Sequence, residues 1–315
     1  MIQIGAMYMG GSDLSVKEFA VAAEAAGFDS VWTGDHLTHY VDGIASLGIV
    51  AGCTERVTVG SNVLVAPFRP AAAVAKALLT TAHSARRRVV MGIGPGGDVP
   101  IELALAGADA RTRGRYTDEA LDVIAGLWSG RPFSYAGRWN RFDEVVMEPV
   151  DGPRPDVWIG GRSPAALRRA VRHGDGYNPY LVSPEQVADR YAALRDLAAQ
   201  DGVDVADGSF DLAATTFYVP GADADDAFRR GFERVGFRGV SEQHFRRSYL
   251  LGDVEDLKRG IEAYLAVGVR HLVIGCAPGA PRQLDGFVAP FAEVLDDVRR
   301  SASVVDGGSM NGERA

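Results

Sequence analysis

Cysteine, excess positive charge and long apolar runs are all scarce in this chain of 315 residues. The two cysteines, Cys53 and Cys276, lie far apart in apolar stretches, so neither a disulfide framework nor a zinc cluster of cysteines is available. No uninterrupted apolar run reaches about 18 residues, and the N-terminus has no basic region, which argues against a membrane span and an export signal. These absences predict a cytoplasmic protein in a reducing compartment, with no membrane partner.

The charge balance is acidic: 41 Asp and Glu face 33 Lys and Arg, for a formal net charge of −8. Proteins that bind the phosphate backbone carry a basic footprint, so we expect no nucleic-acid partner. Apolar residues make up 47% of the chain and charged residues 23%. This composition is typical of a globular protein with a large core and excludes a fibrous or disordered one.

Short apolar runs alternate with amphipathic helical stretches along most of the chain. Eight strand-then-helix units predict an α/β fold of the (β/α)8 TIM-barrel type, in a single domain over residues 1–300. The rival is a doubly wound sheet, which normally has fewer strands and a phosphate fingerprint that is missing here after the first strand. The expected strands span 2–8, 28–32, 57–64, 89–93, 157–159, 176–181, 210–219 and 270–275.

Two segments depart from the alternation. Residues 131–155 hold Tyr135-Ala136-Gly137-Arg138-Trp139 between two β-prone runs, which predicts a hairpin inserted after the fourth helix. Residues 301–315 are polar and contain glycine, and we predict a disordered tail there.

A carboxylate and a histidine follow the second strand, at Asp35 and His36. Catalytic residues of barrels gather at the C-terminal ends of strands, and a histidine with a tuning neighbour suits acid–base work. We therefore predict His36 and Asp35 as catalytic residues; a histidine satisfied by backbone is the alternative. A metal site of Asp35, His36 and His39 lacks a clear further ligand, so no metal is predicted.

The fourth strand ends in Gly92-Ile93-Gly94-Pro95-Gly96-Gly97, which formally matches a dinucleotide fingerprint. That motif requires an immediate helix, whereas a loop follows here and the next expected helix begins near Thr112. We interpret Gly94 and Gly96 as backbone that lets a flat ring approach the barrel mouth. A loop that needs positive φ is the alternative.

A candidate anion site follows the fifth strand at Gly160, Gly161, Arg162 and Ser163, with Pro164 at the start of a helix. Backbone N–H groups at a helix N-terminus, a hydroxyl and a guanidinium suit a phosphate. The alternative is a simple turn capped by Ser163.

Taken together, these motifs resemble the luciferase-like family of flavin- and deazaflavin-dependent oxidoreductases, over roughly residues 1–300. The short connection from Asp35 to Val57 and the Gly92–Gly96 turn are similar to its branch that uses coenzyme F420, such as methylene-tetrahydromethanopterin reductase. The segments that carry the resemblance are Gly34-Asp35-His36-Leu37, Gly60-Ser61-Asn62-Val63-Leu64-Val65, Gly92-Ile93-Gly94-Pro95-Gly96, Arg111-Thr112-Arg113-Gly114-Arg115, Asp118-Glu119-Ala120-Leu121, Gly160-Gly161-Arg162-Ser163 and Asp175-Gly176-Tyr177.

The resemblance implies a cofactor ring at the barrel mouth, backed by a bulge with a non-prolyl cis peptide at Asn62-Val63. It places His36 near the reactive ring carbon, and Gly160, Gly161 and Ser163 on the phosphate side. Sugar-phosphate dehydrogenases of this family carry a glutamate acid shortly after the fourth-strand turn, where Gly97 stands here. This departure argues against sugar-phosphate oxidation by that scheme.

The leading hypothesis is an F420-dependent oxidoreductase that moves hydride between the deazaflavin and a small organic substrate. The alternatives are an FMN-dependent monooxygenase and a non-catalytic barrel that binds a phosphate ligand. The expected mouth is aromatic, which suits a flat or apolar ligand, and the resemblance allows a homodimer through the outer helices. The aromatic residues expected there are Tyr8, Tyr40, Phe68, Tyr177 and Tyr180.

Overall fold

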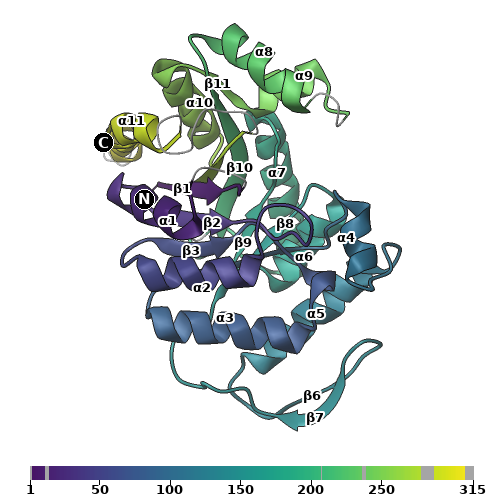
Figure 1. The fold of residues 1–315 in the computed structure, drawn as a ribbon. Helices are drawn as coiled ribbons and strands as arrows, with labels where there is room; N and C mark the ends of the chain where they lie inside the picture. The colour runs from purple at the N-terminus through teal and green to yellow at the C-terminus, as the bar shows by residue number, and fades with distance from the viewer. Residues whose placement is uncertain (1, 11–13, 207, 236–238, 278–286, 309–315) are drawn as a thin grey trace.

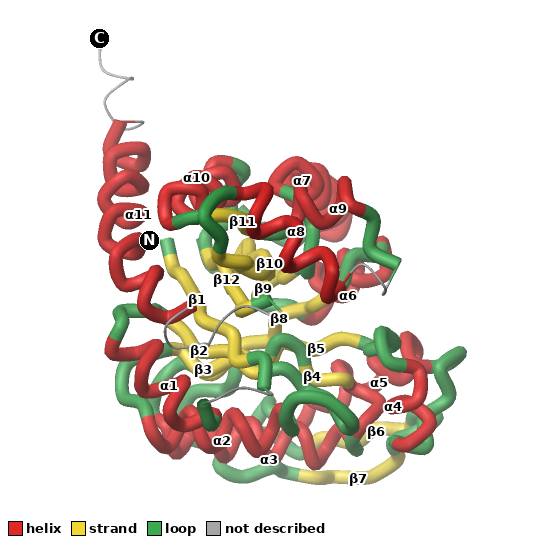
Figure 2. Tube along the Cα trace, turned by 45° about the horizontal axis from the view of Figure 1, so that its top comes forward, coloured by secondary structure: helices red, strands yellow, loops and turns green. Residues whose placement is uncertain are grey.

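Parallel strands close into a barrel in the computed structural model, which describes residues 2–10, 14–206, 208–235, 239–277 and 287–308. Eight strands pair side by side in the order β1-β2-β3-β5-β8-β9-β10-β12, and β12 pairs back to β1. Helices surround this ring, as Figure 2 shows. The predicted (β/α)8 barrel is confirmed.

Most residues of the barrel strands are buried, as expected for parallel strands that are covered by helices. Three further strands lie outside the eight that were expected: β11 beside the end of β10, and the antiparallel pair β6 and β7. The bounds are β1 (Gln3–Tyr8), β2 (Ser30–Thr33), β3 (Thr58–Ser61), β4 (Leu64–Val65), β5 (Val89–Gly94), β6 (Phe133–Ala136), β7 (Arg141–Val145), β8 (Asp156–Gly160), β9 (Gly176–Asn178), β10 (Asp211–Pro220), β11 (Leu250–Gly252) and β12 (His271–Cys276).

Local sequence signals set most helix ends. In α7, for example, Ser183 and Gln186 form a reciprocal capping box, Pro184 occupies the first position, and Gly202 ends the helix at φ +69°. The helices are α1 (Val16–Ala25), α2 (Gly43–Cys53), α3 (Ala71–Ala85), α4 (Pro100–Leu105), α5 (Arg113–Leu127), α6 (Pro164–His173), α7 (Pro184–Asp201), α8 (Ala224–Val235), α9 (Glu242–Ser248), α10 (Val254–Ala266) and α11 (Ala289–Gly308), with a 3₁₀ turn η1 (Ala66–Phe68).

The structure also differs from the expected elements at the third strand, after β5 and at the predicted tail. The third strand is split into β3 and β4, and a short helix, α4, replaces the loop expected after β5. Helix α11 runs on to Gly308 because its sequence offers no breaker before Gly307-Gly308, so the first residues of the predicted tail are helical. Residues 309–315 lie outside the described part of the chain.

The predicted hairpin is present as β6 and β7, which lie apart from the barrel at the bottom of Figure 1. Among the residues that the structure describes, no helix combines the length and apolar content needed to cross a membrane.

The barrel interior is packed rather than hollow. Trp32 and Trp158 stack inside it with ring centroids 4.9 Å apart, and both side chains are fully buried. Glycine leaves the room they need: a Cβ atom at Gly60 would lie 2.3 Å from the Trp32 ring. Because these rings fill the interior, ligand chemistry is confined to the strand ends.

Candidate active site

The residues predicted as functional gather at the C-terminal ends of neighbouring barrel strands. His36 follows β2, Asn62 and Val63 follow β3, Gly94 ends β5, and Gly160 ends β8. Because all these strands are parallel, their ends meet at one face of the barrel. The fold therefore brings the separate motifs to one mouth.

His36 is held by a carboxylate that sequence reasoning missed. Its Nδ1 lies 2.9 Å from Oε2 of Glu102, which α4 carries after the β5 turn. Glu102 is 2% exposed, whereas His36 is half-buried. Glu102 was missed because it lies in a segment that was expected to be a loop, where no helical or strand periodicity marks a residue. Its position five residues after Gly97 is the sequence feature that could have suggested it.

Glu102 is fixed as an anion. Its Oε1 accepts hydrogen bonds from the backbone N–H groups of Leu37 (2.9 Å) and Thr38 (2.8 Å), and from the Thr38 hydroxyl (2.8 Å). Burial opposes ionisation, but hydrogen bonds from Thr38 and His36 outweigh it and lower the pKa of Glu102 to about 2. An ionised carboxylate can only accept, so Nδ1 of His36 must carry a proton. The other ring nitrogen, Nε2, is then left for chemistry.

Asp35, predicted as the carboxylate that works with His36, has other partners. Its two oxygens accept from Arg69 at 2.8 Å each, and from the N–H groups of Gly43 and Val65 at 3.0 Å each. Asp35 is 2% exposed. These four bonds tie the β2 end to α2 and β4, so the carboxylate beside His36 is Glu102 instead.

The bulge after β3 has the cis peptide bond expected at Asn62-Val63. The Asn62 side chain faces into the barrel, where its Nδ2 donates to Thr215 Oγ1 (2.8 Å) and its Oδ1 accepts from Asn178 (3.2 Å). Thr215 donates to Asn178 Oδ1 at 2.9 Å, which closes the network. Asn178 and Thr215 are each 1% exposed and were not foreseen.

The Val63 side chain fills the space that a Cβ atom would need at two glycines of the mouth. A Cβ atom would lie 2.6 Å from a Val63 methyl at Gly160 and 3.2 Å from the other at Gly94. At Gly96, with φ +65°, a Cβ would lie 2.5 Å from Val65. Gly94 and Gly160 make room for the bulge, and Gly96 makes room for Val65 of β4, which differs from our interpretation that Gly94 and Gly96 leave space for a ring directly. A ligand at the mouth would meet the bulge that Gly94 and Gly160 accommodate.

The predicted anion site forms a capped helix start. Ser163 Oγ accepts from the N–H of Ala166 (3.3 Å) at the N-cap of α6, and Pro164 occupies the first helical position. Gly161 has φ +127°, a conformation that favours glycine, and its carbonyl accepts from Tyr177 (2.9 Å). This is the capped turn given above as the alternative, and anion binding at this helix start stays a prediction.

Two of the five expected mouth aromatics belong to the core. Tyr8 and Tyr177 are buried and donate to the carbonyls of Leu14 and Gly161. Tyr40 packs against His36 with ring centroids 5.1 Å apart.

Tyr180 lies among groups from several strand-end loops. Desolvation is the main cause that raises its pKa, with smaller contributions from Tyr249, Asp98 and Tyr40, and Arg162 acts in the opposite direction. The Tyr180 ring meets the Phe217 ring edge-on, with centroids 5.8 Å apart, and its side chain is partly exposed.

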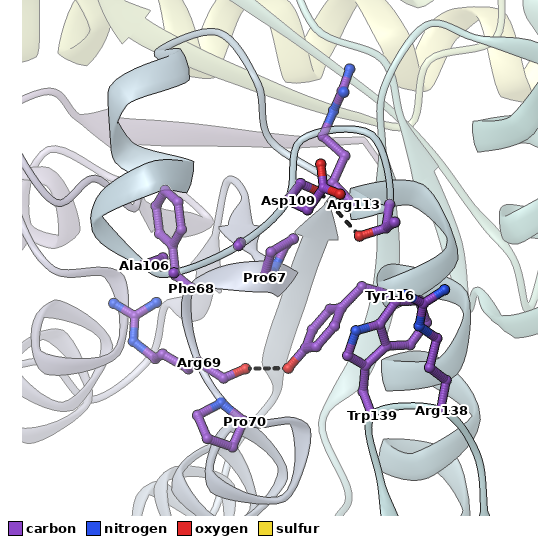
Figure 3. A pocket seen from close by; sticks show the side chains of 13 residues that line it. Pro67, Phe68, Arg69, Pro70, Ala106, Asp109, Arg113, Tyr116, Arg138 and Trp139 are labelled. Atoms are coloured by element: carbon purple, nitrogen blue, oxygen red, sulfur yellow. Dashed lines mark hydrogen bonds between the residues drawn. The ribbon is translucent and has the colours of Figure 1, made fainter.

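A pocket of about 350 Å³ lies beside this mouth, against η1, the end of α4, the start of α5 and the hairpin tip (Figure 3). Tyr116 donates to the Arg69 carbonyl (3.0 Å) across it, and Arg113 Nε donates to the Gly96 carbonyl (3.2 Å). The site residues predicted from the sequence are not among those that line it. Phe68, expected at the mouth, lines this pocket instead.

Comparison with known proteins decides the family. The family model for luciferase-like monooxygenases matches residues 3–235. The chain belongs to this family. It is 29% identical over 315 residues to an F420-dependent glucose-6-phosphate dehydrogenase of Nakamurella multipartita, covering 89% of this chain and 91% of that one.

Solved structures share the fold. An F420-dependent secondary alcohol dehydrogenase, in complex with an F420-acetone adduct, is similar with a TM-score of 0.84 and 22% identity, over 95% of this chain and 99% of that one. The F420-dependent tetrahydromethanopterin reductase of Methanopyrus kandleri is similar with a TM-score of 0.77 and 19% identity, over 94% and 99%. The predicted resemblance to the luciferase-like family and its F420-dependent branch is confirmed.

Proposed function

We propose that this chain is an F420-dependent oxidoreductase that interconverts an alcohol and a carbonyl compound, with His36 and Glu102 as its proton-transfer pair. The observation that carries the proposal is the 2.9 Å contact between His36 Nδ1 and the ionised Glu102 at the barrel mouth. Relatives that act with F420 support the choice of cofactor. Within this proposal, residues 1–300 act as one domain on a small-molecule substrate in the cytoplasm, as a homodimer.

The proton chemistry follows from the tautomer. With its proton on Nδ1, neutral His36 offers the Nε2 lone pair to a substrate hydroxyl and accepts its proton as the carbonyl forms. In the reverse direction Nε2–H returns the proton to the carbonyl oxygen. Glu102 holds the ring in place and stabilises the imidazolium, as the buried carboxylate of a catalytic triad does.

The residues at the mouth fit the cofactor. F420, when bound, supplies the hydride acceptor or donor. Val63 of the bulge would back the ring, and Gly94 and Gly160 leave the room that its side chain needs. The start of α6 at Ser163, with Gly161 before it and the exposed Arg162, would hold the anionic tail.

The glycine at position 97 argued against sugar-phosphate oxidation, but Glu102 brings a carboxylate to His36 from elsewhere in the loop, so this proposal keeps that substrate class open. Secondary alcohols and sugar phosphates, on which the named relatives act, are the first substrates to try.

The proposal is tested by titrating the chain with F420 and with FMN at matched ionic strength, then following the visible absorbance of F420 with 2-propanol and with glucose 6-phosphate. We expect tighter binding of F420 and turnover of one alcohol. His36→Asn, folded by circular dichroism, should slow turnover by about 10²–10⁴-fold.

Two results would contradict the proposal. Tighter binding of FMN, with oxygen uptake on reduction, would favour the monooxygenase. Full activity of His36→Asn would remove His36 from the reaction.

A further inference from the structure

A histidine that the proposed reaction does not use stands next to the catalytic pair. His39 Nδ1 lies 3.6 Å from Glu102 Oε1, and its side chain is 51% exposed. The rings of His36 and His39 meet at 71°, with centroids 6.0 Å apart. One potential ligand atom from each of His36, His39 and Glu102 lies within 4.8 Å of the other two.

We propose that His36, His39 and Glu102 bind a divalent transition-metal cation such as Zn²⁺, and that the bound cation inhibits the enzyme. Two imidazoles and one carboxylate are the ligand set that Zn²⁺ prefers, with solvent in the fourth position. The inhibition rests on the proposed role of His36, whereas the binding does not.

The distances suit a cation of this size. Zn–N and Zn–O bonds of about 2.0–2.2 Å place tetrahedral ligand atoms about 3.3 Å apart. The two contacts with Glu102 lie on either side of that value: His36 Nδ1 is 2.9 Å from Oε2, and His39 Nδ1 is 3.6 Å from Oε1. Small side-chain rotations would therefore complete the site, and the exposure of His39 leaves a path for the ion from solvent.

The carboxylate is already prepared for a cation. Metal-bound carboxylates are commonly oriented by hydrogen bonds from a second layer of groups, and Oε1 of Glu102 accepts three such bonds from Leu37 and Thr38. His39 Nδ1, now 2.7 Å from the Thr38 hydroxyl, would exchange that contact for the metal.

Inhibition follows from which atom is occupied. Zn²⁺ on Nδ1 of His36 uses the lone pair of that nitrogen, so the ring proton that now lies between Nδ1 and Glu102 moves to Nε2. Nε2 then has no lone pair to accept the proton of the substrate hydroxyl.

The test is a Zn²⁺ titration of the metal-free full chain, read by competition with a chromophoric zinc indicator. We expect one Zn²⁺ per chain and affinity at least about tenfold weaker in His39→Gln, since even altered second-layer partners cost about 10–100-fold. His83→Gln removes an exposed histidine at the end of α3, away from the cluster, and should bind as the wild type does. Equal affinity in His39→Gln and the wild type overturns the site.

Activity measurements separate the proposed metal site from the proposed role of His36 in turnover. Zn²⁺ should inhibit F420 turnover by the wild type, reversibly with EDTA, while His39→Gln resists inhibition and keeps the turnover of the metal-free enzyme. If Zn²⁺ bound tightly to the wild type but not to His39→Gln, the metal site would stand. If Zn²⁺ then failed to inhibit the wild type, the proposed inhibition would be refuted and the role of His36 contradicted.

Discussion

Replacing Glu102 with glutamine should reverse the tautomer of His36. Three donors, from Leu37 and Thr38, converge on Oε1 of Glu102. A glutamine in the same pose must keep its carbonyl oxygen there, because an NH₂ group facing three donors would leave them unpaired. Its NH₂ group therefore takes the place of Oε2 and donates to Nδ1 of His36, which moves the ring proton to Nε2.

The expected loss of kcat is large because the basic lone pair on Nε2 of His36 is removed while the shape of the two side chains is kept. Neutral His36 with its proton on Nε2 has no lone pair for the substrate hydroxyl. General acid–base catalysis contributes about 10²–10⁴-fold, so kcat for alcohol oxidation by Glu102→Gln should fall by that factor, or about 2.7–5.5 kcal/mol in barrier. KM should change little, because the substitution leaves substrate contacts in place.

The assay is steady-state turnover of the alcohol that the wild type oxidises, followed by the visible absorbance of F420. Thr38→Val is the matched control: it removes one donor to Oε1, keeps the charge of Glu102, and should lose less than about tenfold. Urea unfolding of both variants checks that they fold. If Glu102→Gln retained kcat within about threefold of the wild type, the acid–base pair would be refuted.

Three further predictions concern the single residues Asp35, Arg162 and His271. Asp35→Asn breaks the buried pair with Arg69 and should lower the free energy of unfolding by about 3–5 kcal/mol in urea titrations; an unchanged midpoint would contradict the structural role. Arg162→Gln should weaken F420 binding by about tenfold at low ionic strength and less in high salt, and a loss that salt does not reduce would speak against an electrostatic contact. Burial lowers the pKa of His271 from its ordinary value of 6.5 to about 3, so the unfolded chain binds this proton first as the pH falls. The free energy of unfolding should then fall below pH 6.5 by up to about 1.4 kcal/mol per pH unit, and His271→Gln should remove that part of the slope.

Most of the barrel could be predicted because its signals are local. Apolar strand-length runs and capped amphipathic helices repeat eight times, and the strands predicted over 89–93 and 270–275 lie within one residue of β5 (Val89–Gly94) and β12 (His271–Cys276). Helix α4 was missed because glycine and proline around Gly96 and Pro100 read as a loop, and six residues are too few for a helical period. Parallel strands then bring every strand-end motif to one mouth, which is why His36 and the start of α6 could be placed from the sequence.

The partners of those residues were decided only by tertiary structure. Glu102 contacts His36 although the two residues are 66 positions apart in the sequence, and Arg69 pairs with Asp35 over a separation of 34 positions. No periodic pattern links such pairs, because barrel closure and loop paths set which side chains meet. Sequence adjacency suggested Asp35 as the carboxylate of His36, but neighbouring residues in an extended segment point in different directions, and in the folded chain the buried carboxylate at its ring is Glu102.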